Sequence, residues 1–580
     1  MGHRHLAASP FLAEHPDSRI RPSAALPSGP ACLWPTHLWP APMSMRRLIL
    51  SALVLAPFAA PSAQVDFFAV RKSFGLYGAV YETLASEYVD AIDAEALMRS
   101  GIGAMTGSLD PYTVYYDEST AAASRLQQGG DVGGVGVIVA ERGGRLVVVS
   151  VLDGSDAERQ GLRPGDAVVE IAGQPADGLA AQRANTLLRG EPGSSVALSV
   201  VREGEPEAVR FVLVRAGDPD TEVTYSGFLE DGVAYVRLGR FLADAAGQVR
   251  SALEALEEEG EVEAVVLDLR GNPGGLLDQA VLLTSLFLPE GTLVTRTEGR
   301  AEGTDQTYRT PTAPAYPDVP LAVLVDGTSA SASEIVAGAV QDHDRGVVVG
   351  ATTFGKGLVQ VVRPMPYGTA LKLTVSRYTT PSGREIQRLA YAQGREAAEI
   401  GAGREVRTIG GRTVRSGVGI EPDVPVTLGE ESELERALVR AAAFLRFANR
   451  FAAETPDLAP GFRVDDDLFA RFRQFVEAEG VAYRTDVERT ADELADDLAE
   501  AGYSGADAAL AALRRSVADE KARDFERHED RLRVVLQREI LSRYVGQRAQ
   551  TVAALAEDPV VAEARRLVRD PAAYGRVLGR

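Results

Sequence analysis

Three serines separated by single alanines, Ser329, Ser331 and Ser333, stand between a short apolar run and a segment with helical spacing. A serine at the start of a helix is most often an N-cap, because its hydroxyl accepts a hydrogen bond from one of the first free N–H groups. One cap accounts for one serine and leaves two hydroxyls unexplained. A nucleophile placed here would gain from the helix dipole once negative charge develops. The segment is therefore a candidate for nucleophilic chemistry.

A second candidate is Lys356, which stands between Gly355 and Gly357 and is followed four residues later by Gln360. Residues at this spacing share one face of a helix and one face of a strand, so the two side chains could converge on one point. A solvated lysine in a surface turn fits the same pattern, and the spacing alone favours that simpler interpretation.

The third candidate is the glycine-rich turn Asp268-Leu-Arg-Gly-Asn-Pro-Gly-Gly275, directly after an apolar run that suits a buried strand. Backbone N–H groups exposed by such a turn can hold a phosphate or a developing oxyanion. An ordinary connection between a strand and a helix is about as consistent with this segment.

Taken together, the segments resemble a known family. Ser-Ala-Ser-Ala-Ser-Glu, then Gln341-Asp342, then Phe-Gly-Lys-Gly-Leu-Val-Gln is similar to the C-terminal processing peptidases, also called tail-specific proteases. Asp-Leu-Arg-Gly-Asn-Pro-Gly-Gly, Thr-Pro-Ser-Gly-Arg (380–384) and Gly-Ile-Glu-Pro-Asp (419–423) resemble the same family. The resemblance covers about residues 66–430. This chain departs from the family by an insertion at 388–416, which affects the local geometry and none of the motif residues.

The resemblance implies a serine endopeptidase with a Ser-Lys dyad, in which Ser331 is the nucleophile and Lys356 the general base. It implies that Gln360 orients the lysine and that Asp342 supports the site. The implied oxyanion hole uses backbone N–H groups of Ala332, Gly274 and Gly275. No metal, nucleotide or other cofactor is implied.

The implied chemistry agrees with what the residues can do. A serine hydroxyl attacks only when a base removes its proton, and a free lysine with a pKa near 10.4 is almost wholly protonated at neutral pH. Burial can lower that pKa by several units and make the amine a usable base. A Ser-His-Asp site using His343 is disfavoured, because that residue lies at the far end of the helix that Ser331 opens, about 18 Å away. The remaining alternative is a non-catalytic peptide-binding scaffold.

Residues 130–217 change to short strands and turns and resemble a PDZ domain in circularly permuted order. The Gly-Leu-Arg-Pro-Gly-Asp turn (161–166) before an apolar strand carries that resemblance. In such modules a peptide adds a strand to a sheet edge, and backbone N–H groups of a glycine-rich loop hold its terminal carboxylate. Here the expected loop is Gly134-Val135-Gly136-Val137. A glycine-rich hairpin without a ligand is the simpler alternative.

The composition excludes several function classes. Lys and Arg number 61 against 82 Asp and Glu, a net charge of −21, which argues against a nucleic-acid partner. The single cysteine, Cys32, excludes a disulfide framework and a Cys₄ zinc site. The expected partners are proteins or peptides with free C-termini, and an adaptor or a second copy of the chain stays open.

The chain of 580 residues has ordinary globular composition, and we expect a multidomain α/β protein. The expected parts are a doubtful upstream extension (1–42), a signal peptide (43–63), an N-terminal helical segment (66–125), a PDZ β-rich module (130–217), an α/β protease core resembling the crotonase/Clp-like fold (220–430) and a helical C-terminal extension (431–580). Arg46-Arg47 before the apolar stretch 48–60 predicts export to the periplasm or cell envelope. An uncleaved N-terminal membrane tether is the alternative.

Overall fold

The computed structural model describes residues 67–121, 133–216, 222–230, 232–388, 403–426, 429, 431–459 and 461–580. The chain divides into two compact units after Ile92. In the first unit, the helix expected from the apolar spacing is α2 (Phe67–Glu87), and none of its residues is buried. The predicted signal peptide and upstream extension lie outside the described residues. None of the described helices is long and apolar enough to cross a membrane.

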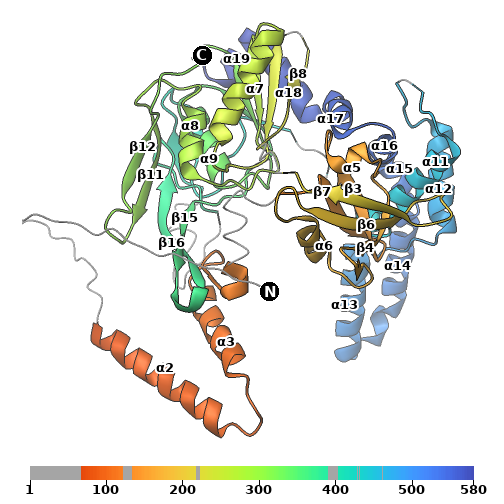
Figure 1. The fold of residues 1–580 in the computed structure, drawn as a ribbon, viewed down its shortest axis with the longest axis horizontal. Helices are drawn as coiled ribbons and strands as arrows, with labels where there is room; N and C mark the ends of the chain where they lie inside the picture. Colours follow the sequence, from red (N-terminus) through yellow and green to blue (C-terminus); the bar gives the residue numbers. More distant parts are fainter. Residues whose placement is uncertain are drawn as a thin grey trace, which may run out of the picture. The chain divides into compact units, whose positions relative to one another are not determined.

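The PDZ module in the second unit is a sheet of short strands with two helices on it (Figure 1, orange and yellow). Its strands run in the order β2-β3-β4-β6-β7, with β5 paired to β4, so β2 is an edge strand. The bounds are β2 (Val137–Arg142), β3 (Arg145–Val151), α5 (Asp156–Arg159), β4 (Ala167–Ile171), β5 (Gln174–Pro175), α6 (Ala181–Leu188), β6 (Ser195–Val201) and β7 (Val209–Val214). The Gly161–Asp166 turn is fixed by Asp166, whose buried carboxylate pairs with Arg202.

The core expected over residues 220–430 is built on a six-stranded sheet in the order β19-β14-β13-β10-β9-β8. All neighbours are parallel except β8 and β9, which are antiparallel. The bounds are β8 (Val223–Phe228), β9 (Val233–Leu238), β10 (Ala264–Asp268), β13 (Leu321–Val325), β14 (Val347–Gly350) and β19 (Val424–Pro425). Strands β10, β13 and β14 are buried at every residue, as expected for central strands covered on both faces.

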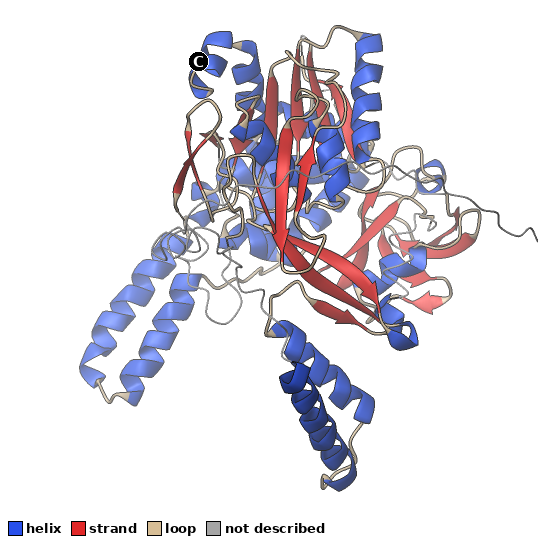
Figure 2. Cartoon of the chain, turned by 90° about the vertical axis from the view of Figure 1, so that its left-hand side faces the viewer, coloured by secondary structure: helices blue, strands red, loops and turns tan. Residues whose placement is uncertain are grey.

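Helices cover both faces of this sheet (Figure 2). One face packs against α7 (Ala245–Glu259), α8 (Leu277–Thr284) and α9 (Ala332–Asp342). The other face packs against the last two helices of the chain, α18 (Pro559–Arg569) and α19 (Pro571–Val577). The C-terminal extension expected over 431–580 therefore does not form a unit apart from the core, because its final helices bury half of the core sheet.

A second, antiparallel sheet joins the core to the segment before the PDZ module. Its order is β1-β16-β11-β12, with β15 also paired to β16. The bounds are α3 (Ala94–Gly107), β1 (Val114–Tyr116), β11 (Leu293–Gly299), β12 (Gln306–Arg309), β15 (Leu358–Pro364) and β16 (Ala370–Thr379). Strand β1 falls inside the segment expected to be helical over 66–125. The apolar spacing missed it because a three-residue strand takes its stability from the β16 ladder.

The remaining C-terminal helices form a bundle around stacked phenylalanines, among them Phe444 and Phe472. They are α10 (Glu433–Arg440), α11 (Ala443–Glu454), α12 (Asp466–Ala478), α13 (Asp486–Glu500), α14 (Asp507–Lys521), α15 (Asp524–Arg527), α16 (Glu529–Leu541) and α17 (Gln547–Ala556). The PDZ residue Asp153 accepts hydrogen bonds from the first two N–H groups of α17, which attaches the module to this bundle.

The described part of the insertion contains a hairpin of β17 (Glu405–Arg407) and β18 (Thr413–Arg415). Arg412 in this hairpin pairs with Asp344 and Asp423, just beyond the C-terminal end of α9. Ser331 lies at the opposite end of α9, so this hairpin leaves the candidate catalytic residues undisturbed.

Candidate active site

The three candidate segments follow three neighbouring parallel strands. The glycine-rich turn follows β10, the serine run follows β13 and the lysine segment follows β14. Asp268 at the end of β10 is level with Leu324 in β13, and Val325 is level with Gly350 at the end of β14. In open α/β sheets the carboxyl ends of the strands form the usual binding crevice, so the topology brings the segments to one place.

Ser331 has a strained backbone. It is the residue before α9, and its φ of 55° lies in the left-handed region that residues other than glycine rarely adopt. Such strain persists only where the surroundings impose it, and it concentrates at functional sites. A strained turn between a strand and a helix is also how the nucleophile is presented in other serine hydrolases.

The two neighbouring serines are engaged in holding the loops. Ser329 donates to Leu269 O at 2.8 Å, and Ser333 donates to Asn272 O at 3.0 Å. Both bonds tie the serine run to the glycine-rich turn, and both serines are fully buried. Ser329 and Ser333 thus have structural roles, and the middle serine is the one whose position suits a nucleophile.

The glycine-rich turn lies directly against the serine run. A Cβ on Gly274 would stand 2.8 Å from Ser331 Cβ and 2.9 Å from the Ala332 nitrogen, so only glycine allows this approach. The Gly274 N–H donates to the Asn272 side chain at 2.9 Å. Among the described residues, Gly275 N–H has no such acceptor. Gly274 N–H is thus already engaged, and the N–H groups of Ala332 and Gly275 stay the predicted oxyanion donors.

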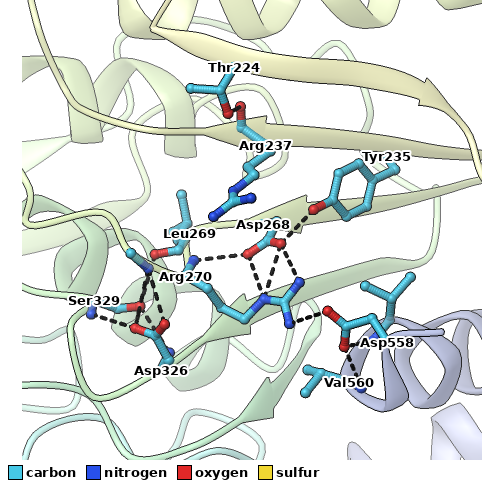
Figure 3. A network of polar contacts seen from close by, with 12 residues as sticks. Thr224, Tyr235, Arg237, Asp268, Leu269, Arg270, Asp326, Ser329, Asp558 and Val560 are labelled. Carbon is cyan, nitrogen blue, oxygen red and sulfur yellow. Dashed lines mark hydrogen bonds and ion pairs between the residues drawn. The ribbon is translucent and has the colours of Figure 1, made fainter. Parts of the chain in front are cut away.

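The start of this turn is fixed by a buried ionic network (Figure 3). Arg270 forms ion pairs with Asp268 at 2.6 Å and with Asp558, the N-cap of α18, at 2.7 Å. Tyr235 donates to the same Asp268 carboxylate at 2.5 Å. Asp326, which precedes the serine run, accepts from Gly271 N–H. The network connects the turn to β9, to the serine run and to the C-terminal helix.

Lys356 is partly buried, and the pKa of its amine is lowered to about 8. Burial is the largest cause, the positive charge of Lys372 on β16 acts in the same direction, and the negative charge of Glu334 opposes both. The ammonium lies 5.0 Å from the centre of the Tyr112 ring. A lysine with this pKa is neutral in a useful fraction of molecules near neutral pH, as a general base must be.

Glu334 is a functional residue that the sequence reasoning did not single out. Its fully buried carboxylate accepts hydrogen bonds from Ser331 N–H at 2.8 Å and from Lys356 N–H at 2.9 Å. It also accepts from Thr353 Oγ1 at 2.6 Å and from Gly355 N–H at 2.7 Å. Burial raises the pKa of Glu334 to about 7, while the hydrogen bonds favour the ionised form. A serine followed three residues later by glutamate is the capping-box signature that could have revealed it.

Tyr378 is a second residue that the sequence reasoning missed. Its hydroxyl hydrogen-bonds to the carbonyl oxygens of Ser331, at 3.2 Å, and of Lys356. Burial raises the pKa of this phenol well above its usual value, so it stays a donor. No sequence pattern connects Tyr378 to either residue, because the contact depends on how β16 crosses the site.

Two predicted supporting residues make contacts elsewhere. Gln360 lies in β15 and donates to Thr374 Oγ1 on β16 at 3.4 Å, so its predicted action on Lys356 stays a prediction. Asp342 lies at the last residue of α9, where it pairs with buried Arg384 and accepts from Ser382 N–H. It therefore supports the 380–384 turn. His343 caps the same end of α9, as expected, far from Ser331 along the helix.

The predicted carboxylate loop of the PDZ module is partly engaged with its own sheet. Gly134 exchanges hydrogen bonds with Ala216 at 3.0 Å, and the Val135 side chain is in the module core. Gly136 has a φ of 73°, and a Cβ there would stand 2.3 Å from Ser155 Cβ. Carboxylate binding at Gly134–Val137 stays a prediction, and glycine at 136 is required by the fold itself.

A side chain of α6 bridges to β2, a sheet edge to which a peptide could add a strand. Asn185 on α6 accepts from Val139 N–H at 3.1 Å and donates to Val139 O at 2.8 Å. A peptide that adds a strand to β2 would use backbone groups of this kind. Asn185 therefore occupies hydrogen-bonding positions that a peptide would need.

Comparison with known proteins places the segments in three family models. Residues 232–392 match Peptidase family S41, residues 133–213 match the PDZ domain, and residues 434–568 match the C-terminal helical domain of a probable PDZ-protease. These ranges agree with the core, the PDZ module and the helical extension described above.

Several curated proteins are similar to about half of this chain. A carboxy-terminal-processing protease of Bartonella bacilliformis is 34% identical over 319 residues, which cover 54% of this chain and 73% of that protein. The carboxy-terminal processing protease CtpB of Bacillus subtilis is 35% identical over 53% of this chain and 64% of its own length. A solved photosystem II D1 C-terminal processing protease matches 64% of this chain and 94% of its own at 27% identity, with a TM-score of 0.36.

Proposed function

The chain belongs to peptidase family S41, the carboxy-terminal processing serine proteases with a PDZ domain, and we propose that Ser331 is its nucleophile and Lys356 its general base. The observation that carries this assignment is that both residues donate their backbone N–H groups to the single carboxylate of Glu334. That carboxylate sets the position of the base relative to the nucleophile, which is what a two-residue mechanism requires.

In the first step, the neutral Lys356 amine removes the Ser331 hydroxyl proton as the serine oxygen attacks the scissile carbonyl carbon. The N–H groups of Ala332 and Gly275 stabilise the oxyanion, aided by the N-terminal end of α9. The lysine ammonium then gives its proton to the leaving amine, and the acyl-enzyme remains. In the second step, water attacks the ester with Lys356 again as base, and the serine is regenerated.

The experiment that tests this assignment is labelling with a serine-directed fluorophosphonate, followed by peptide mapping. The enzyme should be labelled at Ser331, and Lys356→Ala should lose labelling while keeping its thermal unfolding temperature. A non-catalytic peptide-binding scaffold would not be labelled at all. Labelling at Ser329 or Ser333 would contradict the choice of serine.

We further propose that the substrates are proteins recognised through accessible, apolar C-termini by the PDZ module. Its edge strand β2 supports this mode of recognition, because it can pair with an added strand once Asn185 releases the backbone groups of Val139. A fluorogenic peptide with a free carboxylate should be cleaved faster than the same peptide amidated. Equal rates would contradict recognition of the terminus and would leave the Ser331–Lys356 assignment standing.

Export is a separate proposal that rests on the sequence between Met43 and Ala63. Arg46 and Arg47 before a short apolar stretch support a signal peptide. N-terminal sequencing of the protein from fractionated cells tests it: a mature start near residue 64 in the envelope fraction is expected. An unprocessed N-terminus in the membrane fraction would indicate a tether instead.

A further inference from the structure

We propose that Tyr112 is a positioning residue for the catalytic lysine, whose ring shields the Lys356 amine from water and whose hydroxyl holds the lysine segment through Gln387. The proposal rests on the proposed role of Lys356 as base. It gives a function to the Ser-Leu-Asp-Pro-Tyr-Thr segment (108–113), which the catalytic mechanism leaves unused.

The position of Tyr112 is fixed by its own turn. Asp110 is buried, and its carboxylate accepts from the N–H groups of Tyr112 at 2.8 Å and Thr113 at 2.7 Å. The other carboxylate oxygen accepts from the Thr113 hydroxyl at 2.8 Å. Pro111 restricts the backbone between them. An aspartate that closes a turn in this way fixes the backbone of the intervening tyrosine.

The turn precedes the PDZ module in the sequence, but it is attached to the catalytic region that follows the module. Strand β1, directly after the turn, pairs with β16 through Val114 opposite Lys372. The Thr113 hydroxyl accepts from Thr374 N–H on β16 at 3.2 Å. Thr374 also accepts from Gln360, so the predicted lysine-orienting glutamine belongs to the network that holds this turn. The segment before the PDZ module is therefore part of the active site.

The Tyr112 ring covers the amine of Lys356, with 5.0 Å between the nitrogen and the ring centre. Two effects of this contact oppose each other. The electron-rich ring face attracts the ammonium and would raise the lysine pKa. The ring also displaces water, which lowers that pKa. We take the water that the ring displaces to outweigh its attraction for the ammonium, in line with burial as the largest cause of the lowered pKa of Lys356.

Other groups face the lysine or the tyrosine and set the background for this effect. Lys372 from β16 lowers the lysine pKa and Glu334 from α9 raises it. Tyr378 from β16 contacts the Lys356 carbonyl and stays protonated. Asp110 and Arg388 act on the Tyr112 phenol, whose pKa burial raises, so that it is uncharged while Lys356 titrates. None of these groups covers the amine with an aromatic face among the described residues.

The Tyr112 hydroxyl connects to the lysine backbone through one side chain. The Gln387 side chain interacts with the phenol and favours its ionised form, and Gln387 Oε1 accepts from Gly357 N–H at 2.9 Å. Gly357 is the residue directly after Lys356, and a Cβ there would stand 2.8 Å from the backbone nitrogen of Gln387. The phenol and the ring thus act on the same lysine from two sides.

The test is the pH dependence of Ser331 labelling by a fluorophosphonate in the full chain, with kcat and KM for a peptide in parallel. Tyr112→Leu should move the rising limb upward by about one pH unit, which lowers the labelling rate at pH 7 about tenfold. KM should change little, and the rate above pH 10 should approach that of the wild type. Tyr112→Phe keeps the ring, so its rising limb should lie at the same pH as that of the wild type. Its kcat should be lower than that of the wild type, because the link to Gln387 is lost.

Tyr115→Leu, three residues later in β1, is the matched control and should leave the limb in place. An unmoved or lowered limb in Tyr112→Leu would overturn the proposal. If Tyr112→Leu does not fold, Tyr112→Phe still decides: a displaced limb, or an unchanged kcat, would overturn it. Wild-type labelling that shows no rising limb would instead contradict the lysine base itself, so the two failures are distinguishable.

Discussion

Ser331 and Lys356, 25 residues apart in the sequence, donate their backbone N–H groups to the same oxygen, Oε2 of Glu334. Tyr378 connects the carbonyl oxygens of the same two residues from the other side. The proposed nucleophile and base are thus held by their main chains.

The serine series separates chemistry from packing. Ser331→Ala should abolish peptide cleavage at an unchanged unfolding temperature, because nucleophile and base act as a unit. Ser329→Ala should retain cleavage and lose about 1–3 kcal/mol of unfolding free energy, because it leaves buried partners at Leu269 and Asp326 unpaired. Cleavage assays and denaturant melts measure the two effects. Loss of activity in a stable Ser329→Ala would contradict the assignment.

The pH dependence should show a single rising limb in kcat/KM. Lys356 must be neutral, and its pKa is about 8, so the rate should fall about tenfold for each pH unit below that value. Below about pH 7 the fall should be steeper, because Glu334 then takes up a proton as well. Lys372→Met removes a positive charge near Lys356. Its removal stabilises the Lys356 ammonium, so the rising limb should shift to higher pH. A limb that stays in place or moves downward in Lys372→Met would show that the base is a different group.

Glu334→Gln tests the shared carboxylate. An amide offers one accepting oxygen and turns a donor toward N–H groups, so part of the four-bond arrangement is lost. We expect kcat to fall about 100-fold with little change in KM, since each unpaired buried donor costs about 1–3 kcal/mol. Steady-state kinetics measures this. Glu421→Gln, whose carboxylate pairs with Arg415 of the insertion hairpin, is the matched control, and equal activity in the two variants would count against the arrangement.

Asn185→Ala should open the PDZ groove. Removal of the two hydrogen bonds to Val139 frees the edge strand, so a peptide with a free apolar C-terminus should bind about tenfold more tightly. Fluorescence anisotropy in a Ser331→Ala background measures this without cleavage. Thr186→Ala, whose hydroxyl bonds only its own helix at Gln182 O, is the control. Weaker binding by Asn185→Ala would mean that this side chain prepares the groove and does not occupy it.

Truncation before Asp558 should unfold the protease core. Helices α18 and α19 bury Val560, Ala564 and Leu567 on the core sheet, and Asp558 pairs with Arg270. Asp558→Asn should be milder, with lower kcat than wild type at nearly normal circular dichroism. A truncated chain that unfolds at the wild-type temperature would refute this role for the helices.

The sequence alone was enough to identify the PDZ module, the S41 family, and the Ser331 and Lys356 candidates. Each of these predictions rests on a short segment of contiguous residues, in which glycine, serine and lysine stand at the fixed spacing that the turn requires. The central strands could also be predicted from the sequence, because a strand buried on both faces is a nearly continuous apolar run.

The tertiary structure decided which of these residues meet, and through what. From the sequence alone Glu334 is a helix cap, and only the pairing of β13 with β14 brings Lys356 beside it. Tyr112 is likewise a turn residue in the sequence, and only the pairing of β1 with β16 brings it to the site. The sequence predicts the last helices as an extension, whereas in the structure they cover the second face of the core sheet. These contacts join segments separated by tens to hundreds of residues, so no local pattern contains them. They exist because a parallel sheet aligns its strand ends and because its two apolar faces must both be buried.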